Sequence, residues 1–224
     1  MTQPNLEQIA ADLENPDSKY RMLALAALRD VAPADAVPLI KKVLRDQNLQ
    51  VRSMAVFALG LKPTEECYPI LVDLLAADPD YGIRADAAGA LGYLQDNRAV
   101  EPLLRAFYED TDWLVRFSVA VSLGNLKDQR ARDALLQALN SDQEVMQQAA
   151  IAALGELEAV DSVDAILRFA QSPDWLVRQR LAEALGSLPS PKSLSALAYL
   201  AKDGHPHVSE AAKLSLKRLE EATV

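Results

Sequence analysis

The side chains best suited to chemistry lie near the end of the chain, in the segment Asp203-x-His205-x-His207. Imidazole and carboxylate groups at this spacing are able to ligate a transition metal. The segment falls in a loop, however, and the sequence offers no evident fourth ligand. We therefore expect a solvated turn here and no metal site.

The single cysteine, Cys67, follows two glutamates in the segment TEECYPIL. The thiolate is the reactive form of cysteine, and adjacent negative charge disfavours it. One thiol also excludes an internal disulfide and a thiolate zinc site, which favours a reducing, cytoplasmic location. Cys67 is expected to be a small, half-buried packing residue.

The sequence contains few other residues arranged as catalytic groups. The sequence shows no Ser–His–Asp spacing, phosphate loop or dinucleotide fingerprint. Paired carboxylates such as Asp78/Asp80 and Asp110/Asp112 recur at a fixed interval, which is typical of helix capping rather than of acid–base chemistry. We predict no catalytic residue, and the sequence favours a non-enzyme without deciding the point.

The interval belongs to an internal repeat in which an arginine is followed eight residues later by a glycine. The glycines, Gly60, Gly92, Gly124, Gly155 and Gly186, step by 32, 32, 31 and 31 residues. The arginine position holds Arg52, Arg84, Arg116, Gln147 and Arg178, and it extends outward to Arg21 and Ser209. This gives one array of seven copies, approximately 1–31, 32–62, 63–94, 95–126, 127–157, 158–188 and 189–224.

Each copy has the pattern of two helices. Residues 112–126 place Val115, Val119, Leu123 and Leu126 on one face, and residues 97–110 form the preceding helix of the same copy. A glycine inside a helix costs roughly 1 kcal/mol relative to alanine, so its return predicts close approach of a neighbouring helix. The fold class predicted is all-α, an α-solenoid of about seven helix pairs with a 31–32-residue period.

The composition excludes several function classes. The chain has 32 acidic and 23 basic residues, a net charge of -9, and therefore lacks the excess of lysine and arginine that phosphate backbones require. There is neither a run of 18 apolar residues nor a secretory signal. We expect no nucleic-acid partner and no membrane insertion.

The D-x(5)-R segments, each followed by A-x-A-L-G or a close variant, resemble HEAT repeats, and NRAVEPLL and DTDWLVRFSVAVSLGNL are most similar to the short HEAT-like repeats of the phycobilin lyase and phycobilisome-degradation group. The resemblance implies a ladder of Asp and Arg side chains that links successive turns of the solenoid. Its members here are Asp46, Arg52, Asp78, Arg84, Asp110, Arg116 and Arg178. Ser141/Gln147 lacks both charges, while Ser172/Arg178 and Asp203/Ser209 keep one each, so we expect a less regular ladder in the last three copies.

The remaining variable positions lie on the second helices, which line the concave face in HEAT solenoids. In copies two to four these positions are more apolar than a solvated face should be, and further along they become polar. The partner-binding residues predicted are Met54, Phe57, Leu61, Tyr81, Tyr93, Trp113, Phe117, Val121 and Trp175. Trp113 and Trp175 share one repeat position, and packing between repeats is an equal alternative for them.

The function predicted is a non-catalytic protein-binding scaffold or adaptor, with another protein, such as a phycobiliprotein, as its partner. The resemblance also implies an alternative, a bilin lyase or chromophore-detaching factor that acts on phycobiliproteins. A scaffold for iron–sulfur carriers is a further alternative, although one thiol cannot hold a cluster. We expect no resident cofactor, with a transiently held bilin under the lyase alternative.

Overall fold

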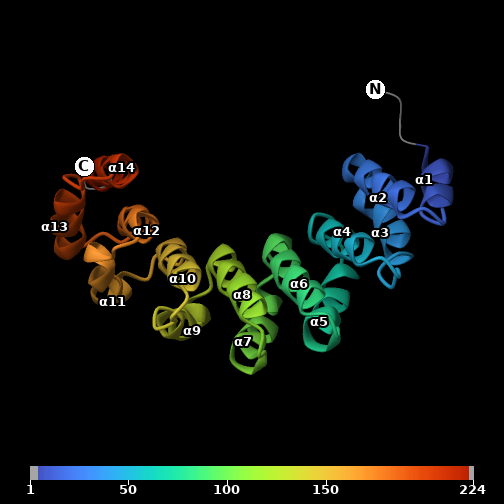
Figure 1. Ribbon diagram of the computed structural model, residues 1–224, viewed down its shortest axis with the longest axis horizontal. Coiled ribbons are helices and arrows are strands. Elements are labelled where there is room, and N and C mark those ends of the chain that lie inside the picture. Colours follow the sequence, from blue (N-terminus) through green and yellow to red (C-terminus); the bar gives the residue numbers. More distant parts are fainter. Residues whose placement is uncertain (1–4, 222–224) are drawn as a thin grey trace. The chain divides into compact units, whose positions relative to one another are not determined.

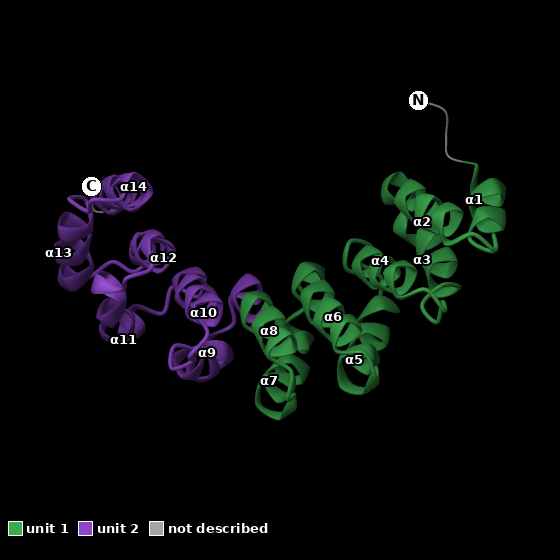
Figure 2. Ribbon diagram, viewed as in Figure 1, with its two compact units in different colours: residues 1–122 green, residues 123–224 purple. Residues whose placement is uncertain are grey.

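The computed structural model describes residues 5–221, which form fourteen α-helices and no β-strand. The helices are arranged as seven successive pairs, α1/α2 to α13/α14, as the repeat predicts (Figure 1). None of the described helices combines the length and the apolar character needed to cross a bilayer. The chain divides into two compact units, residues 1–122 and 123–224, and the division falls inside α8 (Figure 2).

Unit 1 contains the first three helix pairs, α7 and most of α8. In unit 1, the second helix of each pair lies beside the second helix of the next, and the first helices form a separate row (Figure 2). The bounds are α1 Leu6–Asp12, α2 Ser18–Ala27, α3 Pro33–Lys41, α4 Leu49–Gly60, α5 Cys67–Ala77, α6 Tyr81–Leu94, α7 Val100–Glu109 and α8 Trp113–Leu126.

Unit 2 contains the remaining three pairs. Two of its three first helices are short and are extended by 3₁₀ turns at Gln129–Ala131, Val160–Ser162 and Arg168–Gln171. The bounds are α9 Arg132–Ala138, α10 Glu144–Glu156, α11 Val163–Leu167, α12 Trp175–Leu185, α13 Pro191–Leu200 and α14 Pro206–Glu221.

The core of each unit lies between the two rows of helices. The residue before the repeat arginine and those four and seven after it are fully buried, as Val51, Val56 and Leu59 show in α4. Val115 and Val119 of α8 are also fully buried. Burial of one apolar stripe per helix therefore fixes which face of each second helix is left for solvent.

The repeat glycines pack against a small residue in the second helix of the next copy. A Cβ atom on Gly92 would lie 2.8 Å from the Cβ of Ser122, and one on Gly155 would lie 2.7 Å from the Cα of Ala184. Both distances are shorter than real Cβ contacts. The close helix approach predicted from the glycine period is therefore confirmed.

The second helices do not all end at the same point relative to the repeat glycine. The third residue after the glycine is left-handed in the middle copies, where Gln95, Lys127 and Glu158 have φ of 55°, 53° and 54°. Proline, whose φ is fixed near −65°, stands there in copies two and six, as Pro63 and Pro189. Accordingly α6 runs on to Leu94, whereas α4 ends at Gly60 and α12 ends before its glycine.

Candidate functional site

The turn before each second helix is built from two polar residues spaced two apart. The second residue is the N-cap: Asp80 Oδ1 accepts from the backbone N–H of Gly82 at 2.8 Å and of Ile83 at 3.2 Å. The first residue accepts from the N–H of the cap itself, as Asp78 Oδ1 does from Asp80 at 2.9 Å. The recurring carboxylate pairs thus cap helices, as their period predicts.

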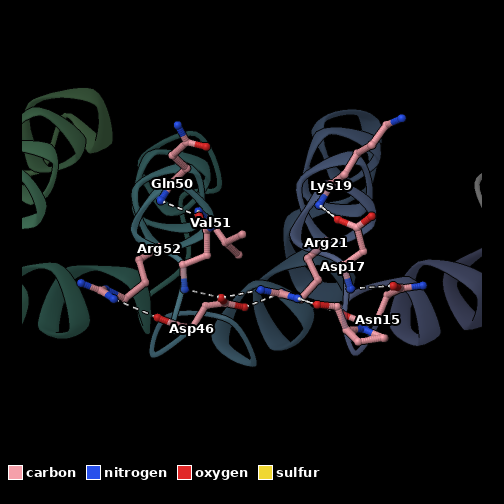
Figure 3. Close-up of polar contacts among 10 residues, drawn as sticks. Asn15, Asp17, Lys19, Arg21, Asp46, Gln50, Val51 and Arg52 are labelled. Carbon is pink, nitrogen blue, oxygen red and sulfur yellow. Dashed lines mark hydrogen bonds and ion pairs between the residues drawn. The ribbon is translucent and has the colours of Figure 1, made fainter.

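The repeat arginine reaches the first of these polar residues in the following copy. Arg84 donates from Nε and Nη2 to both carboxylate oxygens of Asp110, at 2.7 and 3.1 Å. Its Nη1 donates to the backbone carbonyl of Asp78, 3.0 Å away in its own copy. Arg21 and Asp46 form the same two-bond pair at 2.6 and 2.8 Å (Figure 3). Each such arginine therefore ties two consecutive turns together.

Across the last three copies, the ladder keeps one arginine–aspartate pair, which joins the sixth copy to the seventh. Arg178 donates to both carboxylate oxygens of Asp203, at 2.7 and 3.0 Å. The copies Ser172/Arg178 and Asp203/Ser209 each have one charge in sequence, yet together they make one complete bond. In the copy with neither charge, the Gln147 amide still donates to the carbonyl of Ser141 at 2.7 Å.

Two of the predicted ladder arginines lack a carboxylate bond. Arg52 donates to the backbone carbonyl of Asp46 in its own copy at 2.9 Å (Figure 3). It makes no bond to a carboxylate of the following copy, which lies wholly within the described residues. The Nε of Arg116 is buried without a hydrogen-bond partner among residues 5–221. In the sequence, the copy after Arg116 has Ser141 where the ladder needs an aspartate.

The ladder carboxylates are held in their charged form. The hydrogen bond from Arg178 keeps the pKa of Asp203 below its usual range. Burial alone would raise the pKa of Asp110, but the Arg84 hydrogen bond, the N–H of Asp112 and the nearby guanidinium charges together lower it. Both carboxylates therefore stabilise the fold fully above the unfolded pKa of about 3.9, and this stabilisation is lost as the pH falls through their lowered folded pKa.

We predict that Arg84→Gln lowers the free energy of unfolding by about 2–3 kcal/mol at neutral pH, because the half-buried Asp110 loses two charge-assisted bonds. Arg52→Gln is the matched control, since Arg52 has the same repeat position without the carboxylate bond. Its loss should be smaller by at least about 1 kcal/mol. Urea unfolding followed by circular dichroism measures both, and equal losses would contradict a stabilising role for the inter-copy bond.

The predicted partner-binding residues of unit 1 lie on the second helices, except Leu61, which directly follows α4. Phe57 is 49% exposed and Tyr93 is 53% exposed, and their rings meet edge to face at 5.9 Å. Exposed with them are Leu49, Leu61, Tyr81, Trp113 and Val121, while Met54 and Phe117 are half-buried. The Trp113 ring lies 6.5 Å from that of Phe117. The row of second helices thus presents an extended apolar face that is not covered by residues 5–122.

In unit 2 the corresponding positions are mostly polar, and the one predicted aromatic residue has a different environment. Trp175 stacks on the imidazole of His205 at 4.2 Å and lies 5.6 Å from that of His207. Its packing is therefore partly onto the next copy, the alternative that the sequence left open. Asp203 is engaged by Arg178, so it is not available to complete a ligand set with the two histidines.

Two polar residues were missed by sequence reasoning. Lys62 is only 7% exposed, and its ammonium donates to the carbonyls of Arg29 and Val31 at 2.6 Å each. The sequence indicated a buried position for Lys62, because the residue two after the repeat glycine is leucine in the next four copies. Asp86 is half-buried on α6 beside Ser53 and Met54.

Cys67 is fully buried rather than half-buried, and its thiol donates to the carbonyl of Lys62 at 3.0 Å. The predicted packing role is consistent with this position. No group of three or more His, Cys, Asp or Glu side chains within residues 5–221 is arranged to hold a metal ion. The described side chains thus cap helices, link successive copies through arginine–aspartate pairs and present an apolar face on unit 1.

Comparison with known proteins supports the same architecture. No curated protein matches the chain in sequence. Among solved structures, the complex of CpcE and CpcF of phycocyanin lyase from Nostoc sp. PCC7120 is similar over 100% of this chain and 90% of that chain, with a TM-score of 0.66 and 21% identity. An engineered protein is similar over 96% of this chain and 68% of its own, with a TM-score of 0.57 and 20% identity.

Human deoxyhypusine hydroxylase is similar over 96% of both chains, with 20% identity and a TM-score of 0.49. At these identities, the two structures with TM-scores of 0.66 and 0.57 share a fold with this chain and no more. The family profile of HEAT repeats matches residues 4–91, 68–155 and 133–217, which together span nearly the whole sequence. The chain therefore belongs to the HEAT-repeat family.

Proposed function

We propose that this protein is a non-catalytic adaptor that binds another protein through the exposed face of its second helices. The observation that carries the proposal is the apolar face of unit 1, where Phe57, Tyr81, Tyr93 and Trp113 are each about half exposed. Aromatic residues are frequent anchors at protein interfaces, because they offer a large contact area at low entropic cost.

The setting we propose is phycobiliprotein handling, with a phycobiliprotein as the partner. The likeness in fold to the CpcE–CpcF complex supports choosing this class of partner first. The same likeness supports a second candidate function, attachment or removal of a bilin. The described contacts favour the adaptor, since the carboxylates in the turns before the second helices cap those helices or pair with the ladder arginines.

One experiment separates the two candidates. The purified chain is mixed with a phycobiliprotein apo-subunit and free bilin, and complex formation and covalent chromophore attachment are measured on the same samples. We expect a complex without attachment. Bilin bound covalently to the subunit only when this chain is present would establish the lyase instead.

We also predict that Phe57→Ala and Tyr93→Ala each weaken partner binding by about 1–2 kcal/mol, because each removes an exposed anchor. Tyr108→Ala is the matched control: Tyr108 is 55% exposed but belongs to the first helix α7. Binding is measured by calorimetry, with helical content and urea midpoint recorded for every variant. Full affinity in both aromatic variants, or an equal loss in Tyr108→Ala, would contradict the assignment.

A further inference from the structure

Gly89 lies inside α6, but unlike the repeat glycine Gly92 of the same helix it does not lie close to a neighbouring helix. A Cβ atom on Gly92 of the same helix would clash with Ser122, whereas one on Gly89 would meet nothing within 4 Å. Gly89 has no positive φ either. Glycine at such a position costs roughly 1 kcal/mol relative to alanine. Its effect is to leave a bare spot on the exposed side of α6.

Asp86 lies on the same side of α6, one turn before Gly89, and Tyr93 lies one turn after it. The carboxylate lines a cavity of about 380 Å³ between α4 and α6, together with Ser53 and Met54. The Phe57 and Tyr93 rings meet across the same two helices. Phe57 of α4 and Gly89 and Tyr93 of α6 do not line this cavity but follow it along the two helices. We call the surface formed by Ser53, Met54, Phe57, Asp86, Gly89 and Tyr93 the α4–α6 notch.

The carboxylate of Asp86 has no cationic partner among residues 5–221. Burial raises its pKa, the Ser53 hydroxyl offsets part of that rise by hydrogen bonding, and the Asp80 charge adds to it. The nearest repeat arginine on α6, Arg84, is committed to Asp110. A half-buried carboxylate without a countercharge is costly, so this one destabilises the free protein.

The apolar side chains of the notch suit the rest of a long basic side chain. Met54 and the two aromatic rings offer apolar contact to a methylene stem, and ring faces also attract an ammonium group. The absence of a side chain at Gly89 leaves the approach to Asp86 open.

We infer that the α4–α6 notch binds a lysine side chain of the partner protein, with the ammonium on the Asp86 carboxylate and the stem against Met54, Phe57 and Tyr93. The inference rests on the proposed adaptor function and adds the chemistry of the partner, a lysine within an apolar segment. The net charge of -9 favours the approach of such a segment.

The test uses the full chain and short helical peptides with a central lysine between leucines that share its helix face. Matched peptides replace the lysine with norleucine or arginine. Binding is followed by NMR, through the Met54 methyl and Asp86 carboxyl resonances, up to millimolar peptide. We expect the lysine peptide to bind about fivefold or more tighter than the norleucine peptide, the scale of one charge-assisted bond.

The variants are chosen to separate binding from folding. Asp86→Asn should abolish the preference for lysine while raising the urea midpoint, because it removes an uncompensated charge. Asp73→Asn, at an exposed position on α5, removes the same charge elsewhere in unit 1 and should keep the preference. Gly89→Leu fills the bare spot and should weaken both peptides without unfolding the protein.

Equal affinity for the lysine and norleucine peptides, or tighter binding of the arginine peptide, would overturn the inference. So would unchanged NMR resonances of Met54 and Asp86 on binding, or a loss of the preference for lysine in Asp73→Asn equal to that in Asp86→Asn. The proposed function fails separately. If Phe57→Ala and Tyr93→Ala release a bound phycobiliprotein while wild type shows no preference for lysine, the adaptor stands and the lysine assignment does not. A preference for lysine without phycobiliprotein binding gives the reverse result.

Discussion

Gly92→Ala is expected to destabilise the protein by about 1–3 kcal/mol, despite the helix propensity of alanine. The added methyl group would lie 2.8 Å from both the Cβ and the Oγ of Ser122 and 2.9 Å from its Cα. Because the obstacle includes backbone, the two helices must separate. That movement also strains the bond from the Ser122 hydroxyl to the Ala88 carbonyl, now 2.8 Å long.

The matched control, Gly89→Ala, lies in the same helix and should have the opposite sign. Its methyl group enters open space, so it should stabilise the fold by about 0.5–1 kcal/mol. Urea unfolding of the two variants beside wild type measures both changes. A loss in Gly89→Ala as large as that in Gly92→Ala would show that the effect is not one of helix approach.

Lys62→Met is the second change for which a large effect is expected, a loss of about 2–3 kcal/mol. Methionine has a similar length but leaves the carbonyls of Arg29 and Val31 without their 2.6 Å donors. The Val31 carbonyl is buried, so water does not readily replace the ammonium. The ammonium also lies at the end of the first copy's second helix, where a positive charge is favourable.

Two further variants test this explanation. Lys41→Met removes an exposed lysine paired with Glu66 at 2.6 Å and should change stability by less than about 1 kcal/mol. Lys62→Leu introduces the residue that the next four copies have at this position. If Lys62→Leu is as stable as wild type, the two carbonyl bonds contribute nothing and packing alone decides this position.

The sequence predicted the fold because the repeat glycine and the apolar stripe each have one structural meaning. A glycine that recurs every 31 or 32 residues in a helical pattern identifies the point of closest helix approach. The residue it meets could also have been found, because the position six after the repeat arginine is always alanine or serine: Ala58, Ala90, Ser122, Ala153, Ala184 and Ser215.

The sequence could not reveal which of two aspartates in the repeat a ladder arginine contacts. Arg84 lies six residues after Asp78 and 26 residues before Asp110, and its two side-chain bonds go to the distant Asp110. Likewise Asp86 looks like an ordinary surface residue in the repeat frame. Its destabilising effect on the fold is recognised only once the burial of the carboxylate and its lack of a cationic partner are known.

The direction of the ladder bonds bears on how such an array changes length. A copy that has both charges supplies an aspartate to the copy before it and an arginine to the copy after it, as the Arg84–Asp110 bond illustrates. Duplicating such a copy in frame would give the arginine of the first duplicate an aspartate in the second, and the glycine contact would be renewed in the same way. The contacts between copies thus do not depend on the number of copies. In-frame duplication of a copy can therefore lengthen the chain without requiring a new interface.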